Sequence, residues 1–213
     1  MDNRRQFIIG AAALYTSAAW LAPQRASAQG VSNIIELTGE VMVNGRRLSP
    51  DGMVQTGDRV QSGPGSTCGF TIGRDAFLIR PNTDLTLDRG ASLFLINGAR
   101  MVTGAFAAVF GRSDKPRTVF GPTVTAGIRG TGFYMQSHPD ATYFCTCFGE
   151  IDLSAMSGEQ ETVRSSRHVA RRILAAAPGA RRTIMPAPME NHEDAELDRL
   201  ALLVGQRSPW NQR

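Results

Sequence analysis

Two cysteines, Cys145 and Cys147, are the residues of this chain with the clearest chemical potential, and they stand two positions apart in the run YFCTCF. A short run of aromatic residues, cysteine and threonine predicts a β-strand, in which residues two apart point to the same face. The two thiols should therefore share one face, and Phe144 and Phe148 should share the other. If the phenylalanines enter the core, the thiols lie on the outer side of the strand or under a covering segment.

A disulfide is one use for these thiols. In a regular strand the Cα atoms of Cys145 and Cys147 would lie about 6.7 Å apart, near the upper limit for a disulfide, so a direct bridge would be strained. Cys68 lies in another strand-like run and offers a third sulfur. An oxidising compartment would favour a bridge from Cys68 to one of the pair.

A transition-metal site is the alternative use. Cysteine sulfur and histidine nitrogen are the ligands that zinc and related ions prefer. We name Cys145, Cys147 and His138 as metal candidates, with His168 and His192 as further nitrogen donors. Disulfide and metal site both stay open at this point, and we expect no cofactor unless the pair binds such a metal.

A glycine-rich turn at residues 127–132 (GIRGTG) precedes a strand-like run at 133–136. Glycine allows backbone conformations in which a loop can cradle an anion, and Arg129 adds a positive charge. Phosphate-binding loops, however, lead into a helix, whereas this turn leads into a strand. The pattern favours a hairpin or bulge that fixes sheet packing, with anion binding as the alternative.

The first 28 residues have the pattern of an export signal. A twin-arginine start at residues 3–8 leads into an apolar stretch, and Ala26-Ser27-Ala28 supplies a small-residue cleavage pattern. We expect a cleavable twin-arginine signal peptide at 1–28 and a periplasmic protein. The apolar stretch is about 15 residues, shorter than the about 20 that span a bilayer, and no transmembrane segment is expected in the mature chain.

The charge of the remaining chain bounds its partners. Removal of residues 1–28 takes away three arginines and one aspartate and lowers the formal net charge from +4 to +2. That charge is too small to indicate nucleic-acid binding. The length is sufficient for one domain at 29–153 and an extension at 154–213.

Residues 31–153 carry the signals of an all-β domain. Short runs of alternating apolar and polar residues, such as 35–38 and 84–87, are separated by turn signals that include Asn44-Gly45 and Asn97-Gly98. This punctuation predicts a mainly β fold, an antiparallel sandwich or roll with Gly-rich hairpins. Gly39-Glu40 and Gly149-Glu150 each precede an alternating strand, which suggests equivalent bulged strands at the two ends of the domain, paired with each other.

These segments together resemble a FecR domain. The matching elements, in order, are LTGEVMVNG at 37–45, Gly57-Asp58, IRPNTDL at 79–85, INGAR at 96–100 and AGIRGTGF at 126–133. The family's usual form of the last element is Arg-Gly-Thr, an acidic residue and Phe, and Gly132 stands here in place of the acidic residue. The resemblance covers about residues 31–155.

The resemblance implies a sensing role. FecR-type proteins are periplasmic sensors that relay outer-membrane iron-siderophore signals to a cytoplasmic sigma factor. Such a transducer needs a cytoplasmic anti-sigma segment and a transmembrane helix, and the pattern of this chain supplies neither. The resemblance therefore implies a stand-alone module that recognises a protein partner or a cell-envelope ligand.

The extension at 154–213 is expected to hold a basic β-hairpin and one short helix. Two pairs, Arg171-Arg172 and Arg181-Arg182, flank a Pro178-Gly179 turn, and with Arg129 they are the candidate contacts for an acidic partner or an anionic cell-wall ligand. A merely solvated hairpin is the alternative. The helix is expected at 191–204, with Asn191 as its cap and Gly205 as its stop.

No catalytic arrangement is apparent. The three histidines are scattered, and Ser66, Ser113 and Ser154 lack the context of a nucleophile elbow. We therefore predict a non-catalytic, exported binding or sensing module rather than an enzyme. The alternative function is a thiol-based metal-binding or redox protein that uses Cys145 and Cys147.

Overall fold

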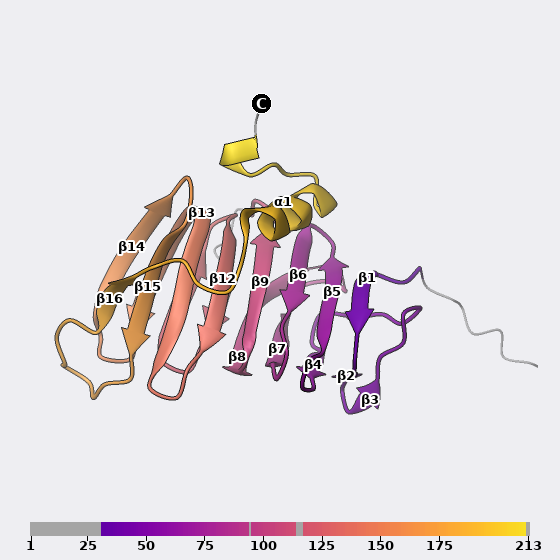
Figure 1. Cartoon of the computed structure of the whole chain (residues 1–213), viewed down its shortest axis with the longest axis horizontal. Helices are drawn as coiled ribbons and strands as arrows, with labels where there is room; N and C mark the ends of the chain where they lie inside the picture. The colour runs from indigo at the N-terminus through magenta and orange to yellow at the C-terminus, as the bar shows by residue number, and fades with distance from the viewer. Residues whose placement is uncertain (1–30, 94, 114–116, 212–213) are drawn as a thin grey trace, which may run out of the picture.

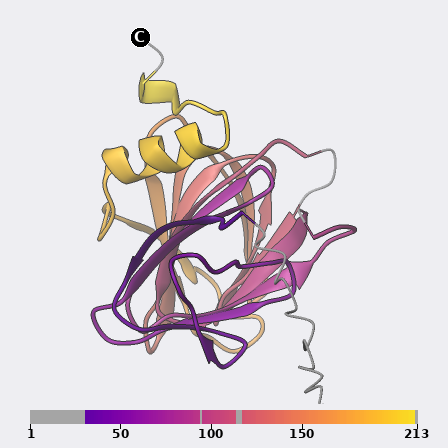
Figure 2. The ribbon, with the colours of Figure 1, turned by 90° about the vertical axis from the view of Figure 1, so that its right-hand side faces the viewer.

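The computed structural model describes residues 31–93, 95–113 and 117–211, and its strands form two layers that share one long strand (Figures 1 and 2). The expected signal segment at 1–28 lies outside the described residues.

Sheet A contains, in spatial order, β1 (Ile34–Thr38), β5 (Thr67–Ile72), β6 (Asp75–Ile79), β9 (Ala105–Phe110), β12 (Gly132–Ser137), the first half of β13 (Ala141–Ala155), β15 (Val169–Leu174) and β16 (Ile184–Ala187). Sheet B contains β3 (Arg46–Arg47), β2 (Val41–Val43), β4 (Arg59–Ser62), β7 (Asp84–Arg89), β8 (Ile96–Thr103), β10 (Arg117–Phe120), β11 (Val124–Ile128), the second half of β13, and β14 (Gln160–Ser165).

The mainly β prediction is confirmed. Neighbouring strands run antiparallel except for β8 and β10, which are parallel. The apolar residues of both sheets form a core between the layers. On the sheet A side of that core, phenylalanine rings lie 4.9 to 5.6 Å apart in a row across five strands, namely Phe70, Phe77, Phe110, Phe133 and Phe144.

Both Gly-Glu pairs mark places where the chain crosses from sheet A to sheet B. Gly39 (φ +73°) connects β1 to β2, and Gly149 (φ +94°) divides β13 into its two halves. A left-handed backbone is accessible to glycine at little cost, and here it bends the strand out of one layer into the other. The strands that follow the two pairs were expected to pair with each other, and this is wrong, because β2 pairs with β3 and β4 whereas the second half of β13 pairs with β11 and β14.

The two Asn-Gly turn signals have different outcomes. Asn44 (φ +51°) and Gly45 (φ +76°) form the expected tight turn between β2 and β3. Asn97-Gly98 was expected to be a turn, and this is wrong, because both residues lie within β8. A Cβ on Gly98 would lie 1.8 Å from the carbonyl oxygen of Thr118, so glycine is needed there for close approach of β10.

The glycine-rich turn does not join a hairpin. It carries the chain from β11 in sheet B to β12 in sheet A, and each of these strands pairs with a different half of β13. The bulge expected beside this turn is present, since the register between β12 and β13 shifts at Gly132 and Phe133. The ring of Phe148 occupies the space that a side chain at position 132 would need.

The C-terminal extension continues both sheets. β14 adds to the second half of β13, whereas β15 adds to the first half and pairs with β16 across the loop 175–183, so the predicted C-terminal hairpin is confirmed. The domain boundary at residue 153 stays a prediction, and β13 runs across it.

The predicted helix is also present as α1 (Asp194–Leu203), and a short 3₁₀ turn, η1 (Pro209–Asn211), follows. Glu193 rather than Asn191 precedes its first turn, and Gly205 (φ +71°) follows its end as expected. α1 lies across β6, β9 and β12 on the outer face of sheet A (Figure 1). Within the described ranges, no helix has the length and apolar character needed to span a membrane.

We predict that Gly132→Ala destabilises the protein by about 1–3 kcal/mol, since its Cβ would lie 2.2 Å from a ring carbon of Phe148. Gly127→Ala, in the same turn, is the matched control, because the nearest atom to its Cβ is 3.7 Å away. We expect it to change the free energy of unfolding by less than about 0.5 kcal/mol. Urea unfolding of both variants measures the difference, and equal losses would contradict the packing argument.

Candidate metal centre

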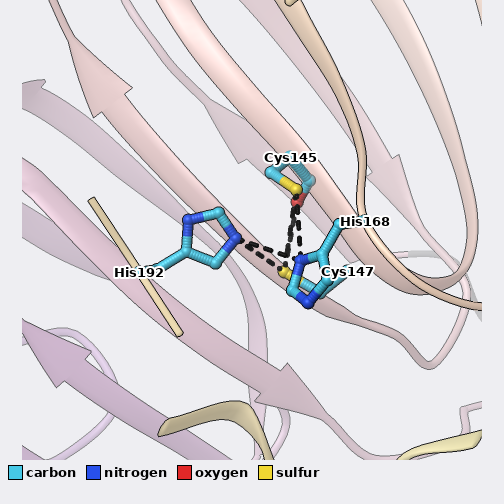
Figure 3. A group of neighbouring side chains, drawn as sticks. All are labelled: Cys145, Cys147, His168 and His192. Carbon is cyan, nitrogen blue, oxygen red and sulfur yellow. Dashed lines mark hydrogen bonds between the residues drawn. The ribbon is translucent and has the colours of Figure 1, made fainter. Parts of the chain in front are cut away.

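Four side chains with metal-binding atoms meet in one group (Figure 3). Their cysteines pack with apolar residues of α1 on the outer side of sheet A. Cys145 and Cys147 come from β13, His168 from the turn that leads into β15, and His192 from the segment between β16 and α1. We call this group the Cys₂His₂ cluster. Figure 3 shows the two imidazole rings approaching the two sulfur atoms.

A bulge in β13 shapes the cysteine half of the cluster. Gly132 pairs with Phe148 and Phe133 pairs with Thr146, which leaves Cys147 as the extra residue. Strict alternation is therefore broken, and Phe148 lies in the same apolar cluster as the two thiols. The prediction that Phe148 shares the opposite face with Phe144 is wrong for this reason.

His168 is held by its backbone and by a carboxylate. It has a left-handed backbone (φ +46°), and its N–H donates to the carbonyl oxygen of Cys147 at 3.0 Å. Its Nε2 lies 2.6 Å from Oδ1 of Asp194, in the first turn of α1. Because a carboxylate accepts hydrogen bonds, Nε2 carries the proton and Nδ1 is the nitrogen turned toward the sulfurs.

His192 is held in the same way by a carbonyl group. Its Nδ1 donates to the backbone oxygen of Glu190 at 2.6 Å, so its Nε2 is free to act as a ligand. The ring stacks on Tyr134 at 4.6 Å between centroids. Tyr143 anchors the segment that carries His192, since its hydroxyl donates to the oxygen of Pro188 and accepts from the N–H of Glu190.

Four of the six separations among the ligand atoms are close to the edges of a zinc tetrahedron. The two sulfurs lie 4.0 Å apart, and the two facing nitrogens lie 3.2 Å apart. Cys145 Sγ lies 3.7 Å from His168 Nδ1, and Cys147 Sγ lies 3.5 Å from His192 Nε2. All four atoms are within 4.8 Å of one another. A tetrahedral zinc ion, with bonds of about 2.3 Å to sulfur and about 2.0 Å to nitrogen, separates its ligand atoms by about 3.3–3.8 Å.

Burial and mutual contact change the acidity of the cluster. The Cys145 and Cys147 side chains are fully buried. The hydrogen bond from Cys147 lowers the pKa of the Cys145 thiol against the opposing effect of burial, and His168 and His192 lower it further. Burial raises the pKa of the Cys147 thiol. A lowered pKa at Cys145 favours the thiolate, the form that binds a metal ion, whereas Cys147 would have to release its proton on binding.

Aromatic rings close the site from solvent. Trp210, in η1, lies 5.1 Å from the His168 ring and 5.7 Å from the Phe148 ring, measured between centroids. The His168 side chain is 7% exposed. The arrangement supplies four protein ligands whose side chains are buried, with hydrogen-bonded groups behind both imidazoles.

Two of the sequence candidates lie elsewhere. His138 is not part of the cluster, because it lies in the turn beyond the Ser137–Thr142 pair of the β12–β13 hairpin, whereas Cys145 is opposite Tyr134. Cys68 forms no disulfide, because it is packed in the core between the sheets while the cysteine pair lies on the outer side of sheet A.

The candidate partner-binding arginines are mostly engaged within the chain. Arg171 forms a forked pair with Glu161, and Arg172 pairs with Glu190 at 2.8 Å. Arg129 lies 3.5 Å from Asp152, with both side chains exposed. Arg181 and Arg182 are exposed in the loop between β15 and β16. A basic rim exists, but two of its four charges already have carboxylate partners.

Comparison with known proteins shows a likeness of fold. No family model and no curated protein matches this chain. It is similar to the crystal structure of a "putative anti-sigma factor" from Parabacteroides distasonis, with a TM-score of 0.50 and 13% identity over 70% of this chain and 65% of that chain. A second such structure from the same organism has a TM-score of 0.48 at 12% identity, over 68% of this chain and 64% of that one. This chain thus spans less than two thirds of the length of either structure, and membership of the FecR family stays a prediction.

We predict that Tyr143→Phe lowers the free energy of unfolding by about 1–3 kcal/mol, because it removes the hydroxyl that bonds Pro188 and Glu190. Tyr134→Phe is the matched control in the same apolar cluster, where the lost hydroxyl lies beside the side chains of Gln136 and Arg80 and bonds no backbone group of the segment that carries His192. Its loss should cost about 1 kcal/mol or less. Urea unfolding in the presence of a chelator compares the two, and a larger loss for Tyr134→Phe would refute the anchoring role of Tyr143.

Proposed function

We propose that this protein is a non-catalytic sensing module that binds a thiophilic transition-metal ion, zinc in the first instance, through Cys145, Cys147, His168 and His192. The spacing of the four ligand atoms carries the proposal. Of the six separations among these atoms, three are 3.2 to 3.7 Å and fall near the edges of a zinc tetrahedron, the two sulfurs are 4.0 Å apart, and all six are within 4.8 Å.

The ligand set favours zinc over harder ions. Thiolate sulfur and imidazole nitrogen suit zinc and copper, whereas magnesium and calcium need several oxygen ligands. A Cys₂His₂ set in tetrahedral array is typical of a structural zinc site, in which the protein supplies all four ligands. Catalytic zinc sites keep one position for water or substrate. The closed arrangement, covered by Trp210, therefore supports stable binding rather than catalysis.

The groups behind the ligands support the same function. Asp194 accepts from His168, and the Glu190 carbonyl accepts from His192. Such partners fix the tautomer and the direction of each ring and raise the affinity for metal. In both histidines the acceptor bonds to the proton-bearing nitrogen, so the other ring nitrogen, the one beside the sulfurs, is left without a proton. A histidine that only fills space in a core does not require this arrangement.

A regulatory role in the cell envelope is the second part of the proposal. The fold likeness to a "putative anti-sigma factor" and the resemblance to FecR domains favour recognition of a protein partner. The twin-arginine pattern at residues 3–8 favours export to the periplasm. In this proposal the metal ion stabilises the packing of the C-terminal segment on sheet A. A partner or anionic envelope ligand binds elsewhere on the surface of the module.

We predict that the purified protein binds one zinc ion per chain and that Co²⁺ in its place gives the visible bands of a tetrahedral thiolate complex. Cys145→Ser/Cys147→Ser should abolish both signals, because serine hydroxyls do not replace thiolates as zinc ligands. Elemental analysis and Co²⁺ titration are the measurements.

Matched controls are available for both ligand types. Cys68→Ala removes the thiol of the inter-sheet core and should leave zinc binding intact. His138→Ala should also retain zinc, whereas His168→Ala and His192→Ala should lose most of their affinity. Zinc retained by the double cysteine variant, or lost equally in Cys68→Ala, would rule out the proposed site.

We further predict that Asp194→Ala weakens zinc binding by about 10–100-fold, because it removes the acceptor that orients His168. Asp198→Ala is the matched control, since Asp198 lies on the same helix and contacts Ser208 and Asn211 instead of a ligand. Competition with a chromophoric chelator measures both affinities. The same affinity in the two variants would show that Asp194 does not support the metal site.

A further inference from the structure

A basic hollow opens at one end of the sandwich, on parts of the chain that the metal site does not use. Its volume is about 780 Å³. Its wall is formed by the ends of strands from both layers, including the β5–β6 turn of sheet A and the start of β10 in sheet B. Four arginines and one aspartate line it, namely Arg74, Arg112, Arg117, Arg129 and Asp75.

Arg117 is the fixed cation of this hollow. Its side chain is only 9% exposed, and its guanidinium group donates to Asp75 and to the backbone oxygen of Gly111. It also lies over the ring of Phe110, 4.5 Å from the centroid. Its Nε–H is buried and has no partner among the described residues. The protein thus holds this planar cation in place without satisfying all of its donors.

The other three arginines surround it. Arg74 and Arg112 form no ion pair within 4 Å in the described part of the chain, although the charge of Arg74 acts on Asp75, and Arg129 has the exposed 3.5 Å contact with Asp152. The glycine-rich turn brings two of them together, since Gly130 (φ +80°) lies against the backbone of Arg112 and Arg129 precedes it. The glycine-rich turn therefore positions arginines that line the hollow, in addition to its contribution to sheet packing.

The charge of the lining is unbalanced. Among the described residues that line the hollow, four guanidinium groups accompany one carboxylate, which leaves an excess of three positive charges in that lining. Like charges gathered this way repel one another and destabilise the fold unless a counter-ion lies among them. Guanidinium groups match phosphate oxygens in geometry and can bind them in a bidentate manner.

We propose that this hollow is a binding site for a phosphate-type oxyanion carried on a small molecule. An excess of three charges favours a polyvalent phosphate over a monovalent carboxylate. The volume lies within the about 300–1,000 Å³ of small-molecule sites, so it exceeds the needs of a single phosphate group. Leu95 and Ile96 give one side of the hollow an apolar surface for an organic substituent.

Isothermal titration with pyrophosphate, phenyl phosphate, inorganic phosphate and acetate tests the site on the full chain. We expect saturable binding of pyrophosphate that weakens as salt is added, and no saturation by acetate. Tighter binding of phenyl phosphate than of inorganic phosphate would assign the site to an organic phosphate, and equal binding would assign it to the free anion. Failure of all three phosphates to saturate would overturn the proposal.

The variant Arg74→Ala/Arg112→Ala links the binding to this hollow. Neither side chain forms an ion pair within 4 Å of a described carboxylate, so the change keeps the direct Arg117–Asp75 contact, although it removes the charge of Arg74 near Asp75. We expect at least a tenfold loss of pyrophosphate affinity from the loss of two charge-assisted contacts. Arg46→Ala/Arg47→Ala removes the same charge from the exposed strand β3 and should bind as the unchanged protein does. Equal affinity in the two double variants would overturn the assignment, and an unchanged thermal unfolding midpoint verifies that each is folded.

Discussion

Strand β13 belongs to both layers, and the rest of the fold is arranged around that constraint. Its first half pairs with β12 and β15 in sheet A, and its second half pairs with β11 and β14 in sheet B. A strand can serve two layers only if its backbone bends sharply between them, and Gly149 (φ +94°) supplies the bend. A Cβ at that position would meet the side chain of Thr131 at 2.3 Å, so the neighbouring turn is packed against the bend as well.

The same strand places the chemistry. The bulge at Cys147 adds one residue to β13 opposite Gly132 and Phe133, and it turns Cys147 and Phe148 to the side where α1 lies. β15 pairs along the first half of β13, and His168 immediately precedes β15. The backbone N–H of His168 donates to the carbonyl oxygen of Cys147. Three of the four proposed ligands are thus positioned by the hydrogen-bond register of neighbouring strands. The fourth, His192, is positioned by the segment that descends from β16 into α1.

Local patterns in the sequence were sufficient for the elements and insufficient for the site. Alternation and Asn44-Gly45 predicted strands and a hairpin that exist, because strand face and turn conformation depend on adjacent residues. Asn97-Gly98 has the same local signal, but Gly98 lies within a strand and allows Thr118 of β10, 20 residues away in sequence, to pack closely against it. His168 and His192 lie 21 to 47 residues from the two cysteines in the chain, so only the pairing of β13 with β15 and the path of the C-terminal segment could reveal them as partners. Their only local signal was residue type.

A metal ion at the Cys₂His₂ cluster would link sheet A and the C-terminal segment, which otherwise meet through apolar packing and partly exposed ion pairs. α1 is held to sheet A by the packing of Leu197, Leu200 and Ala201 and by ion pairs such as Arg80–Glu196. Partly exposed ion pairs contribute little, about 0–1 kcal/mol each, and a ten-residue helix does not hold its shape alone. His192 and Asp194 lie where this helix begins, so a metal ligand and the carboxylate behind a second ligand both come from the covering segment. Metal binding that requires these residues in place would therefore also stabilise the packing of α1 on sheet A. Loss of the metal would make it easier for α1 to leave the sheet.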